Sequence, residues 1–313
     1  MVLHARTSEG FVQTIKVNFV DFWVNFIKTD NYFYNLLSTK YNVIIDEVDP
    51  DIVFYSVDYD RKNEKVKYLN TRAKLIYYTG ESQLPNWEEC DLAFTFDYND
   101  VHSKNYRFPL WAMYLNWFNR PYNANRDHAY LHNIDDFLEK KIYKRLQLQT
   151  KLQFCNFVYS NPAGHRVQFY NEFSSRKHIV SAGRVCNNTG TSIPGRSDHI
   201  EKIQFLKKFK FTIAFENRDY LGYTTEKLIH PMFCNSIPIY WGNDRVGITD
   251  FNPKSFIQAK SFPTNNALID YVLYLDSNLD EYFKILEQPW FIDGKIPDFV
   301  LPNNVLSAIE GIL

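Results

Sequence analysis

The chain has 313 residues, a length that fits two domains of about 150 residues each better than one. Its formal net charge is -1, from 35 Lys and Arg against 36 Asp and Glu. This balance argues against a dedicated nucleic-acid-binding protein, whose surface is usually basic. Hydrophobic residues make up 45% of the chain, which excludes global disorder. Aromatic residues make up 17%, and such side chains suit packed cores as well as the binding of sugar rings or nucleobases.

The first ten residues are polar, and no apolar run approaches the roughly 20 residues that a membrane-spanning helix needs. We therefore expect a soluble protein without signal peptide or membrane anchor. The cysteines, Cys90, Cys155, Cys186 and Cys234, form no C-x-x-C pair, so neither a zinc ribbon nor a thioredoxin-like motif is expected. A reducing cytoplasm is the simplest location that fits. Cys155 and Cys234 stand in apolar segments and are expected in the core.

Short apolar runs alternate with helical patterns in the first half of the chain. Strands are expected at residues 14–19, 51–55, 74–78 and 91–96, and a helix at 32–37. Such bounded apolar runs are typical of buried parallel strands. Residues 119–132, rich in Asn and Arg, are expected to form a loop. The charged segment 135–152 is expected to form a helix near the domain junction.

The second half continues this alternation. Strands are expected at 154–159, 178–180, 211–215 and 236–241, and helices at 166–173, 198–209, 224–233, 267–275 and 281–286, with Asp198 as an N-cap. Alternating strands and helices predict parallel sheets covered on both faces. Two such halves predict two Rossmann-like domains facing each other across a cleft. The phosphate-binding patterns G-x-x-x-x-G-K-[ST] and G-x-G-x-x-G are both absent.

The segment from Phe215 to Lys227 links an expected strand to an expected helix. In open α/β sheets, ligands bind beyond the carboxyl ends of the strands, and a helix N-terminus directs backbone N–H groups into that crevice. Glu226 in the first turn suits the helix dipole, whereas Lys227 opposes it at a cost of about 0.3–1 kcal/mol. A diphosphate bound there would interact with both the dipole and the ammonium group. A solvated helix lysine is the alternative.

This segment resembles the α-1,3/4-fucosyltransferases of glycosyltransferase family 10. The family hallmark reads F-x-F-E-N-S-x-x-x-x-Y-x-T-E-K, followed by an apolar stretch and I-P-[IV]-Y-[WL]-G. The chain has Phe215-Glu216-Asn217, then Tyr223-Thr224-Thr225-Glu226-Lys227, then Ile237-Pro238-Ile239-Tyr240-Trp241-Gly242, with Arg218 where Ser is usual. The resemblance runs from about residue 50 to residue 290, and its N-terminal matches, such as Tyr78-Thr79-Gly80-Glu81, are weaker. The chain resembles the bacterial members more, because the stem and anchor of the animal enzymes are not expected in it.

The resemblance implies a GT-B architecture, with an acceptor-binding domain at residues 1–145 and a GDP-fucose-binding domain at residues 146–313. The C-terminal helices would be able to pack back on the first domain. The implied reaction is transfer of fucose with inversion from GDP-fucose to a hydroxyl of an N-acetylglucosamine-containing glycan, with α-1,3 linkage favoured. No cofactor is implied, and the partners would be the nucleotide sugar and an oligosaccharide acceptor, with peripheral membrane contact left open. A GT-B enzyme using another nucleotide sugar and a sugar-binding protein without catalysis are the alternatives.

The resemblance also assigns residues to the donor site. Lys227 and Arg184 would bind the diphosphate, Glu226 would accept hydrogen bonds from ribose hydroxyls, and Asn217 and Tyr223 would line the same pocket. A surface turn is the alternative for Arg184, and in some family members the arginine lies two positions later. Turn formation by Asn217 and core packing by Tyr223 are their alternatives. Replacement of Lys227 by Ala is expected to weaken donor binding, because its ammonium group would contact the diphosphate. Stability is expected to stay nearly unchanged, because Lys227 opposes the helix dipole.

Glu81 is the candidate catalytic base. It follows an expected strand and Thr79-Gly80, and inversion by direct displacement requires a carboxylate beside the acceptor hydroxyl. An exposed loop glutamate is the alternative, and Glu88 and Glu89 rank below Glu81 as bases.

Two D-x-D sequences are similar to the manganese motif of GT-A enzymes, but both are far from the nucleotide motif. They are Asp49-Pro50-Asp51 and Asp58-Tyr59-Asp60. The eight histidines show no H-E-x-x-H spacing. We therefore expect no metal ligands and no metal requirement.

Overall fold

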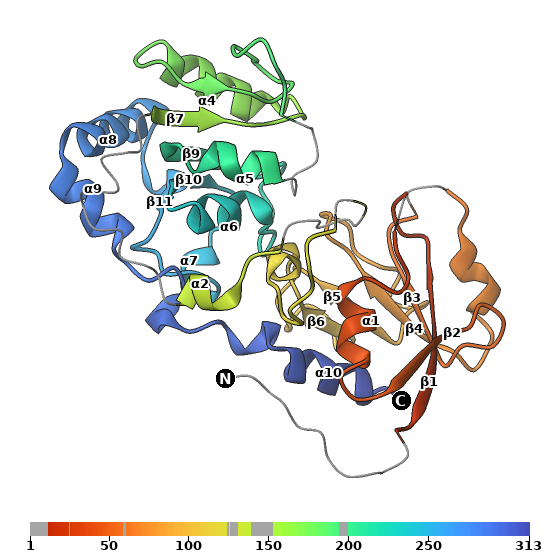
Figure 1. Cartoon of the computed structure of the whole chain (residues 1–313). Coiled ribbons are helices and arrows are strands. Elements are labelled where there is room, and N and C mark those ends of the chain that lie inside the picture. Colours follow the sequence, from red (N-terminus) through yellow and green to blue (C-terminus); the bar gives the residue numbers. More distant parts are fainter. Residues whose placement is uncertain are drawn as a thin grey trace.

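A computed structural model describes residues 12–24, 26–58, 61–123, 125, 131–138, 153–193 and 200–313. Within these residues the chain forms two α/β domains, each built on a parallel sheet (Figure 1). The prediction of two α/β domains with parallel sheets is therefore confirmed.

The first sheet contains six parallel strands in the order β2-β1-β3-β4-β5-β6. These are β1 Thr14–Val20, β2 Asn42–Ile45, β3 Ile52–Tyr55, β4 Lys74–Tyr78, β5 Leu92–Thr95 and β6 Asn105–Arg107. Helix α1 Tyr32–Leu37 and the 3-10 helices η1 Glu64–Tyr68 and η2 Leu110–Tyr114 accompany them. Strands β3 and β5 are buried along their whole length, because apolar side chains cover both faces of the sheet. Apolar and polar residues therefore do not alternate along these two strands.

The second sheet contains five parallel strands in the order β11-β10-β9-β7-β8. These are β7 Gln153–Phe157, β8 Val180–Ser181, β9 Phe209–Phe215, β10 Ile237–Trp241 and β11 Ile257–Gln258. The accompanying helices are α4 Gly164–Ser174, α5 Ile200–Leu206, α6 Glu226–Phe233, α7 Val246–Thr249, η3 Ala259–Ser261, α8 Asn265–Ser277 and α9 Leu279–Leu286. The strand order reverses between β7 and β9, and such a switch point opens a crevice at the carboxyl ends of the strands.

The chain passes from the first domain to the second before β7 and returns to the first domain after α9. Helix α2 Ile134–Leu138 lies against the second domain, where the ring of Phe137 is 5.8 Å from that of Phe233. After η4 Ile292–Gly294 and η5 Asp298–Val300, helix α10 Pro302–Glu310 returns to the first domain beside α1 (Figure 1). There the Tyr41 hydroxyl donates to Glu310 Oε1 at 2.7 Å.

The expected elements are present with small shifts at their ends, and β2, β6, β11, α7 and α10 are additional. The helix expected from Thr224 begins at Glu226, because Thr225 has an extended backbone and caps the helix. Three predictions concern residues outside the described part of the chain. They are the helix and domain junction within 139–152, the N-cap at Asp198, and the D-x-D sequence that contains Tyr59 and Asp60.

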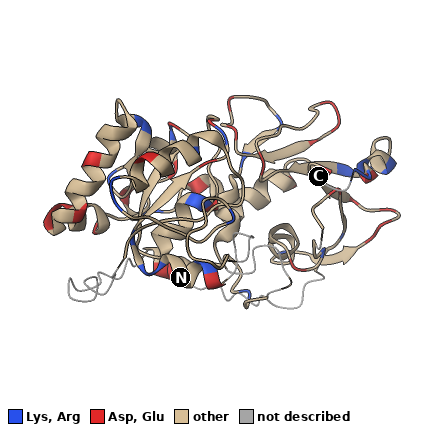
Figure 2. Ribbon diagram, turned by 90° about the horizontal axis from the view of Figure 1, so that it is seen from above, with Lys and Arg blue, Asp and Glu red and all other residues tan. Residues whose placement is uncertain are grey.

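Acidic and basic residues are interspersed over both domains in Figure 2. Among the described residues, no helix combines the length and the apolar character that crossing a membrane requires. Cys155 and Cys234 are buried in hydrophobic clusters, which confirms their predicted role as small core residues.

Candidate functional site

Glu216 lies directly after β9 and has a fully buried side chain. Thr225 donates its backbone N–H to Glu216 Oε1 at 2.8 Å and its hydroxyl to Oε2 at 2.8 Å. Gly242 leaves space for this carboxylate, since a Cβ there would lie 2.7 Å from Glu216 Cγ. Burial raises the pKa of Glu216, while the neighbouring Lys227 opposes that shift. The strand end is therefore joined to the start of α6 through a buried carboxylate.

Lys227 lies between two carboxylates in the first turn of α6. Its Nζ is 3.4 Å from Glu216 Oε2 and 3.3 Å from Glu226 Oε1. Burial would lower the pKa of Lys227, but the charges of Glu226 and Glu216 raise it well above its usual value. Burial would likewise raise the pKa of Glu226, yet Lys227 holds it at about 2. The protein's own carboxylates thus offset the unfavourable position of Lys227, and that position alone does not require a bound anion.

Arg166, near the start of α4, occupies the switch point and was not anticipated from the sequence. Its buried guanidinium donates to the carbonyl of Phe215 at 2.8 Å and to Asn217 Oδ1 at 2.5 Å. It also stacks 4.2 Å from the ring centre of Tyr159, beyond the end of β7. Asn217 is therefore held by a charged donor. The sequence feature that could have identified Arg166 is its place in the first turn of the helix after β7, which lies outside the hallmark sequence.

Tyr223 is buried against the first domain, with its ring centre 5.4 Å from that of Phe96 in an edge-to-face contact. Burial raises the pKa of the Tyr223 hydroxyl, and the charges of Glu216 and Glu81 add to this effect. Glu81 and Tyr223 are thus within electrostatic range of each other, although they belong to different domains.

Arg184 is exposed in the turn that follows β8. This turn lies tightly against the strand end of β7. A Cβ at Gly183 would meet the Tyr159 carbonyl oxygen at 2.3 Å, and the Val185 N–H donates to the same oxygen at 3.0 Å. Arg184 therefore stands at the same edge of the sheet as Glu216, two strands further along.

Glu81 is half-buried in a short turn after β4. Its backbone N–H donates to Thr79 Oγ1 at 2.9 Å, and its carbonyl accepts from the Gln83 N–H at 2.7 Å. The two lower-ranked carboxylates lie further along the connection from β4 to β5. Glu89 Oε2 accepts from Lys65 Nζ at 2.6 Å, an interaction that lowers the pKa of Glu89, and Glu88 is exposed.

No group of three or more His, Cys, Asp and Glu residues suited to a metal ion occurs in the part of the chain that the structure describes. The first D-x-D sequence has other interactions. Asp49 Oδ2 accepts from Arg72 Nη2 at 2.6 Å, and Asp51 Oδ2 accepts from the Lys16 N–H at 2.9 Å. Metal independence stays a prediction.

Two Rossmann-like domains with a charged cluster at the switch point of the second sheet are typical of the GT-B class of glycosyltransferases. Residues 133–290 match the model of the glycosyltransferase family 10 (fucosyltransferase) C-terminal region. Residues 17–114 match the α-(1,3)-fucosyltransferase FucT N-terminal domain. The chain belongs to glycosyltransferase family 10.

Three relatives illustrate this membership. The chain is 32% identical over 283 residues to α-(1,3)-fucosyltransferase FucT of Helicobacter pylori, a match that covers 84% of this chain and 57% of that protein. It is 25% identical over 292 residues to GDP-fucose protein O-fucosyltransferase 3 of Xenopus tropicalis, covering 91% of this chain and 58% of that protein. The crystal structure of an α1,3-fucosyltransferase with GDP-fucose superposes with a TM-score of 0.74 and 27% identity, covering 99% of this chain and 93% of that chain.

The chain thus spans little more than half the length of these two curated relatives. The superposition covers almost the whole chain and confirms the predicted GT-B fold class.

Proposed function

We propose that this chain transfers fucose with inversion from GDP-fucose to a hydroxyl of an N-acetylglucosamine-containing glycan, in α-1,3 linkage. The observation that carries the proposal is the cluster of Asn217, Tyr223, Glu226 and Lys227 around the start of α6, in a chain that superposes on an α1,3-fucosyltransferase with bound GDP-fucose. The second domain would bind the donor, and the first would bind the acceptor.

In the proposed donor site, Lys227 and Arg184 stabilise the negative charge that develops on the departing GDP. Lys227 lies between two carboxylates, whereas Arg184 is exposed at the same edge of the sheet. Glu226 accepts hydrogen bonds from the ribose hydroxyls. Asn217, held by Arg166, and Tyr223 complete the pocket.

Glu81 is the proposed general base. The acceptor oxygen attacks C1 of fucose as the bond from C1 to the diphosphate oxygen breaks, and the hydroxyl proton passes to the Glu81 carboxylate. Direct displacement inverts the configuration at C1. The electrostatic influence of Glu81 on Tyr223 supports this role, because it indicates that the base approaches the donor domain.

On the acceptor side, the proposal places one contact surface at a small pocket of about 30 Å³ in the first domain, which has room for the edge of an acceptor and not for a whole sugar ring. Aromatic side chains, including Trp23 and Phe26, line it beside Tyr78, together with Asp30 and Arg120. Tyr78 precedes Glu81 by three residues. Flat aromatic faces beside hydrogen-bonding groups suit sugar rings.

A second acceptor class is a protein hydroxyl. This alternative is favoured by the similarity to the Xenopus tropicalis protein O-fucosyltransferase, which extends over 91% of the chain. It would use the same donor site.

The test is GDP release with GDP-fucose in the presence of N-acetyllactosamine, of a folded serine- or threonine-containing domain, or of neither. UDP-glucose serves as the control donor, and the anomeric configuration of the product is read by NMR. We expect acceptor-dependent GDP release with the glycan and an inverted anomeric centre. Turnover only with UDP-glucose, or no acceptor-dependent release at all, would contradict the proposal.

A further inference from the structure

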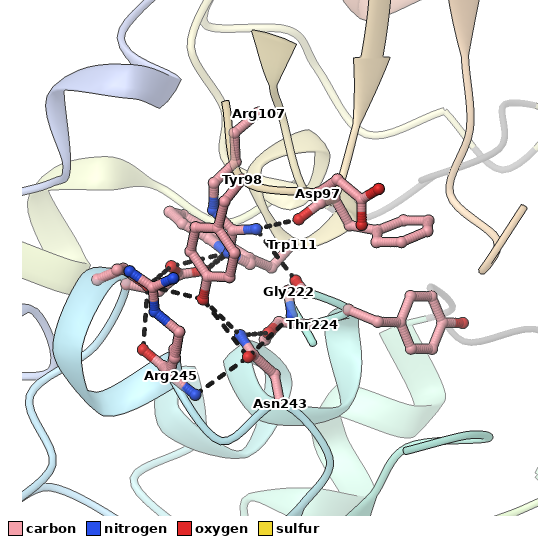
Figure 3. Close-up of polar contacts among 12 residues, drawn as sticks. Asp97, Tyr98, Arg107, Trp111, Gly222, Thr224, Asn243 and Arg245 are labelled. Atoms are coloured by element: carbon pink, nitrogen blue, oxygen red, sulfur yellow. Dashed lines mark hydrogen bonds and ion pairs between the residues drawn. The ribbon is translucent and has the colours of Figure 1, made fainter. Parts of the chain in front are cut away.

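Arg107, at the end of β6, joins the two domains through a buried side chain. Its Nη2 donates to both oxygens of Asp250 at 2.9 and 2.7 Å, and its Nη1 donates to the carbonyl of Gly222 at 3.2 Å (Figure 3). Nη1 also donates to the carbonyl of Phe96 in its own domain. One guanidinium from the first domain therefore contacts two separate loops of the second.

Gly222 belongs to the segment 218–225, here called the donor loop, which leads from Asn217 into α6. Its backbone N–H donates to Asn243 Oδ1 at 2.9 Å, so both of its peptide groups are fixed. Its φ of +93° lies in the region that favours glycine, and a Cβ there would come within 2.4 Å of the Phe96 carbonyl oxygen. The first domain thus touches the backbone of the donor loop directly.

The backbone conformation at Gly222 determines where the proposed donor-binding residues that follow it begin. The next residue, Tyr223, packs its ring against Phe96, and the hydroxyl of Thr224 lies 3.2 Å from Asn243 Nδ2. Thr225 then caps α6, where Glu226 and Lys227 begin the helix. A shift of Gly222 would therefore displace the start of α6.

Two other contacts around Arg107 stabilise the domain junction without touching the donor loop. Trp111 donates its Nε1–H to Asp250 Oδ2 at 2.9 Å. The ring of Tyr98 lies between the guanidinium groups of Arg107 and Arg245, at 4.4 and 4.2 Å from their central carbons (Figure 3). This difference separates the role of Arg107 from that of Trp111.

We infer that Arg107 is a positioning residue for the donor loop, and that with Phe96 it makes the donor site of the second domain depend on its contact with the first. The inference rests on the proposed donor site. A change at the domain junction then alters GDP affinity through the donor loop, and not through contact between Arg107 and the nucleotide.

The test compares Arg107→Lys with Trp111→Phe. Lysine keeps the charge facing Asp250 but cannot contact Asp250 and Gly222 at once. We expect GDP affinity, measured by calorimetry, to fall about tenfold in Arg107→Lys, a loss in the range of one charge-assisted hydrogen bond. Amide hydrogen exchange of residues 222–227 should also accelerate in the absence of nucleotide. Trp111→Phe should lower the melting temperature and leave GDP affinity and these exchange rates unchanged.

Equal loss of GDP affinity in both variants would make Arg107 a stability residue and overturn the inference, as would unchanged affinity in a folded Arg107→Lys. If Arg107→Lys does not fold, Phe96→Leu replaces it, and wild-type GDP affinity in that variant would overturn the inference. A wild-type protein that binds no GDP contradicts the proposed donor site itself, whereas hydrogen exchange reports on the loop independently of that site.

Discussion

The buried carboxylate of Glu216 and the ammonium group of Lys227 lie 3.4 Å apart, and the hydroxyl of Thr225 is within hydrogen-bonding distance of both. Glu216 follows β9, whereas Thr225 and Lys227 belong to the start of α6. The interaction therefore ties the end of a central strand to the beginning of the helix. It gives Lys227 a structural role in addition to the proposed role in donor binding.

Lys227→Ala is expected to lower both GDP affinity and stability. The sequence alone led to the expectation of unchanged stability, because only the helix dipole was in view. In the structure, removal of the ammonium leaves the Glu216 carboxylate buried without its cation, and breaking a buried ion pair costs about 3–5 kcal/mol. Urea unfolding and calorimetry with GDP measure the two effects.

A double variant separates these two roles of Lys227. Lys227→Ala with Glu216→Gln carries no unpaired buried charge at position 216 and should regain part of the lost stability, while GDP affinity stays low. The exposed Lys254 offers a matched control, and Lys254→Ala should change neither quantity. Wild-type GDP affinity in Lys227→Ala would remove this residue from the donor site.

A second prediction concerns the stability of the protein in acid. Burial opposes ionisation of Glu226, but Lys227 lowers its pKa from 4.5 to about 2. A carboxylate with a lowered pKa in the folded state adds stability above its ordinary pKa, and this contribution is lost as the pH falls from about 4.5 toward 2. The stability difference between Glu216→Gln and the double variant Glu216→Gln with Glu226→Gln should therefore be largest near neutral pH and shrink across this window.

Denaturant unfolding between pH 2.5 and 7, a window set by this lowered pKa, measures the difference. Glu287→Gln, at an exposed position, is the control. Glu216, whose pKa is raised by burial and also by the charge of Glu226, is replaced by Gln in both proteins, so that its own titration does not enter the comparison. A stability difference that stays constant over the whole range would contradict the interaction between Glu226 and Lys227.

Local sequence patterns were sufficient for elements with clear ends. Residues 74–78 form β4 as predicted, because an apolar run is followed by Thr79-Gly80. Residues 32–37 form α1 as predicted, and the side chain of Asn31 caps it by accepting from the Tyr34 N–H. Strand β2 was missed although it is apolar, because its run of Val43, Ile44 and Ile45 is only three residues long; it lies at a sheet edge, where its side chains are partly exposed.

Interactions between distant parts of the chain could not be predicted in this way. Arg107 and Asp250 are 143 positions apart, and neither belongs to a periodic pattern that indicates the other. Arg166 likewise reaches Asn217 only because the sheet order reverses between β7 and β9. The hallmark sequence predicted Asn217, Tyr223, Glu226 and Lys227 as donor-site residues, a prediction that stays untested, but it gave no indication of the residues that hold them in place.

A third prediction is catalysis without a divalent cation. The side chains of Lys227 and Arg184 can supply the positive charge that a metal ion would otherwise direct at the diphosphate. Fucose transfer should therefore proceed at an undiminished rate after treatment with EDTA, and added manganese should not increase it. Loss of turnover in EDTA that manganese restores would show that the reaction needs a metal.

The fourth prediction concerns Glu81, whose carboxylate is proposed to take the proton of the acceptor hydroxyl. Glu81→Gln keeps the size of the side chain but cannot accept this proton, and removal of a general base costs about 10²–10⁴-fold in rate. Transfer should therefore slow at least roughly a hundredfold, while GDP-fucose binding stays at the wild-type level. Hydrolysis of GDP-fucose by water should fall less than transfer, because Lys227 and Arg184 act on the departing GDP independently of Glu81.

Glu89→Gln is the matched control, because Glu89 follows the same strand but interacts with Lys65 at 2.6 Å. It should retain near-normal transfer. The rate of the wild-type enzyme should decrease on the acidic side of its pH profile, as the base becomes protonated, and Glu81→Gln should lack this decrease. Near-normal transfer by Glu81→Gln would assign the base to another residue. Combined loss of transfer and of GDP-fucose binding would instead mean that Glu81 supports the donor site through its proximity to Tyr223.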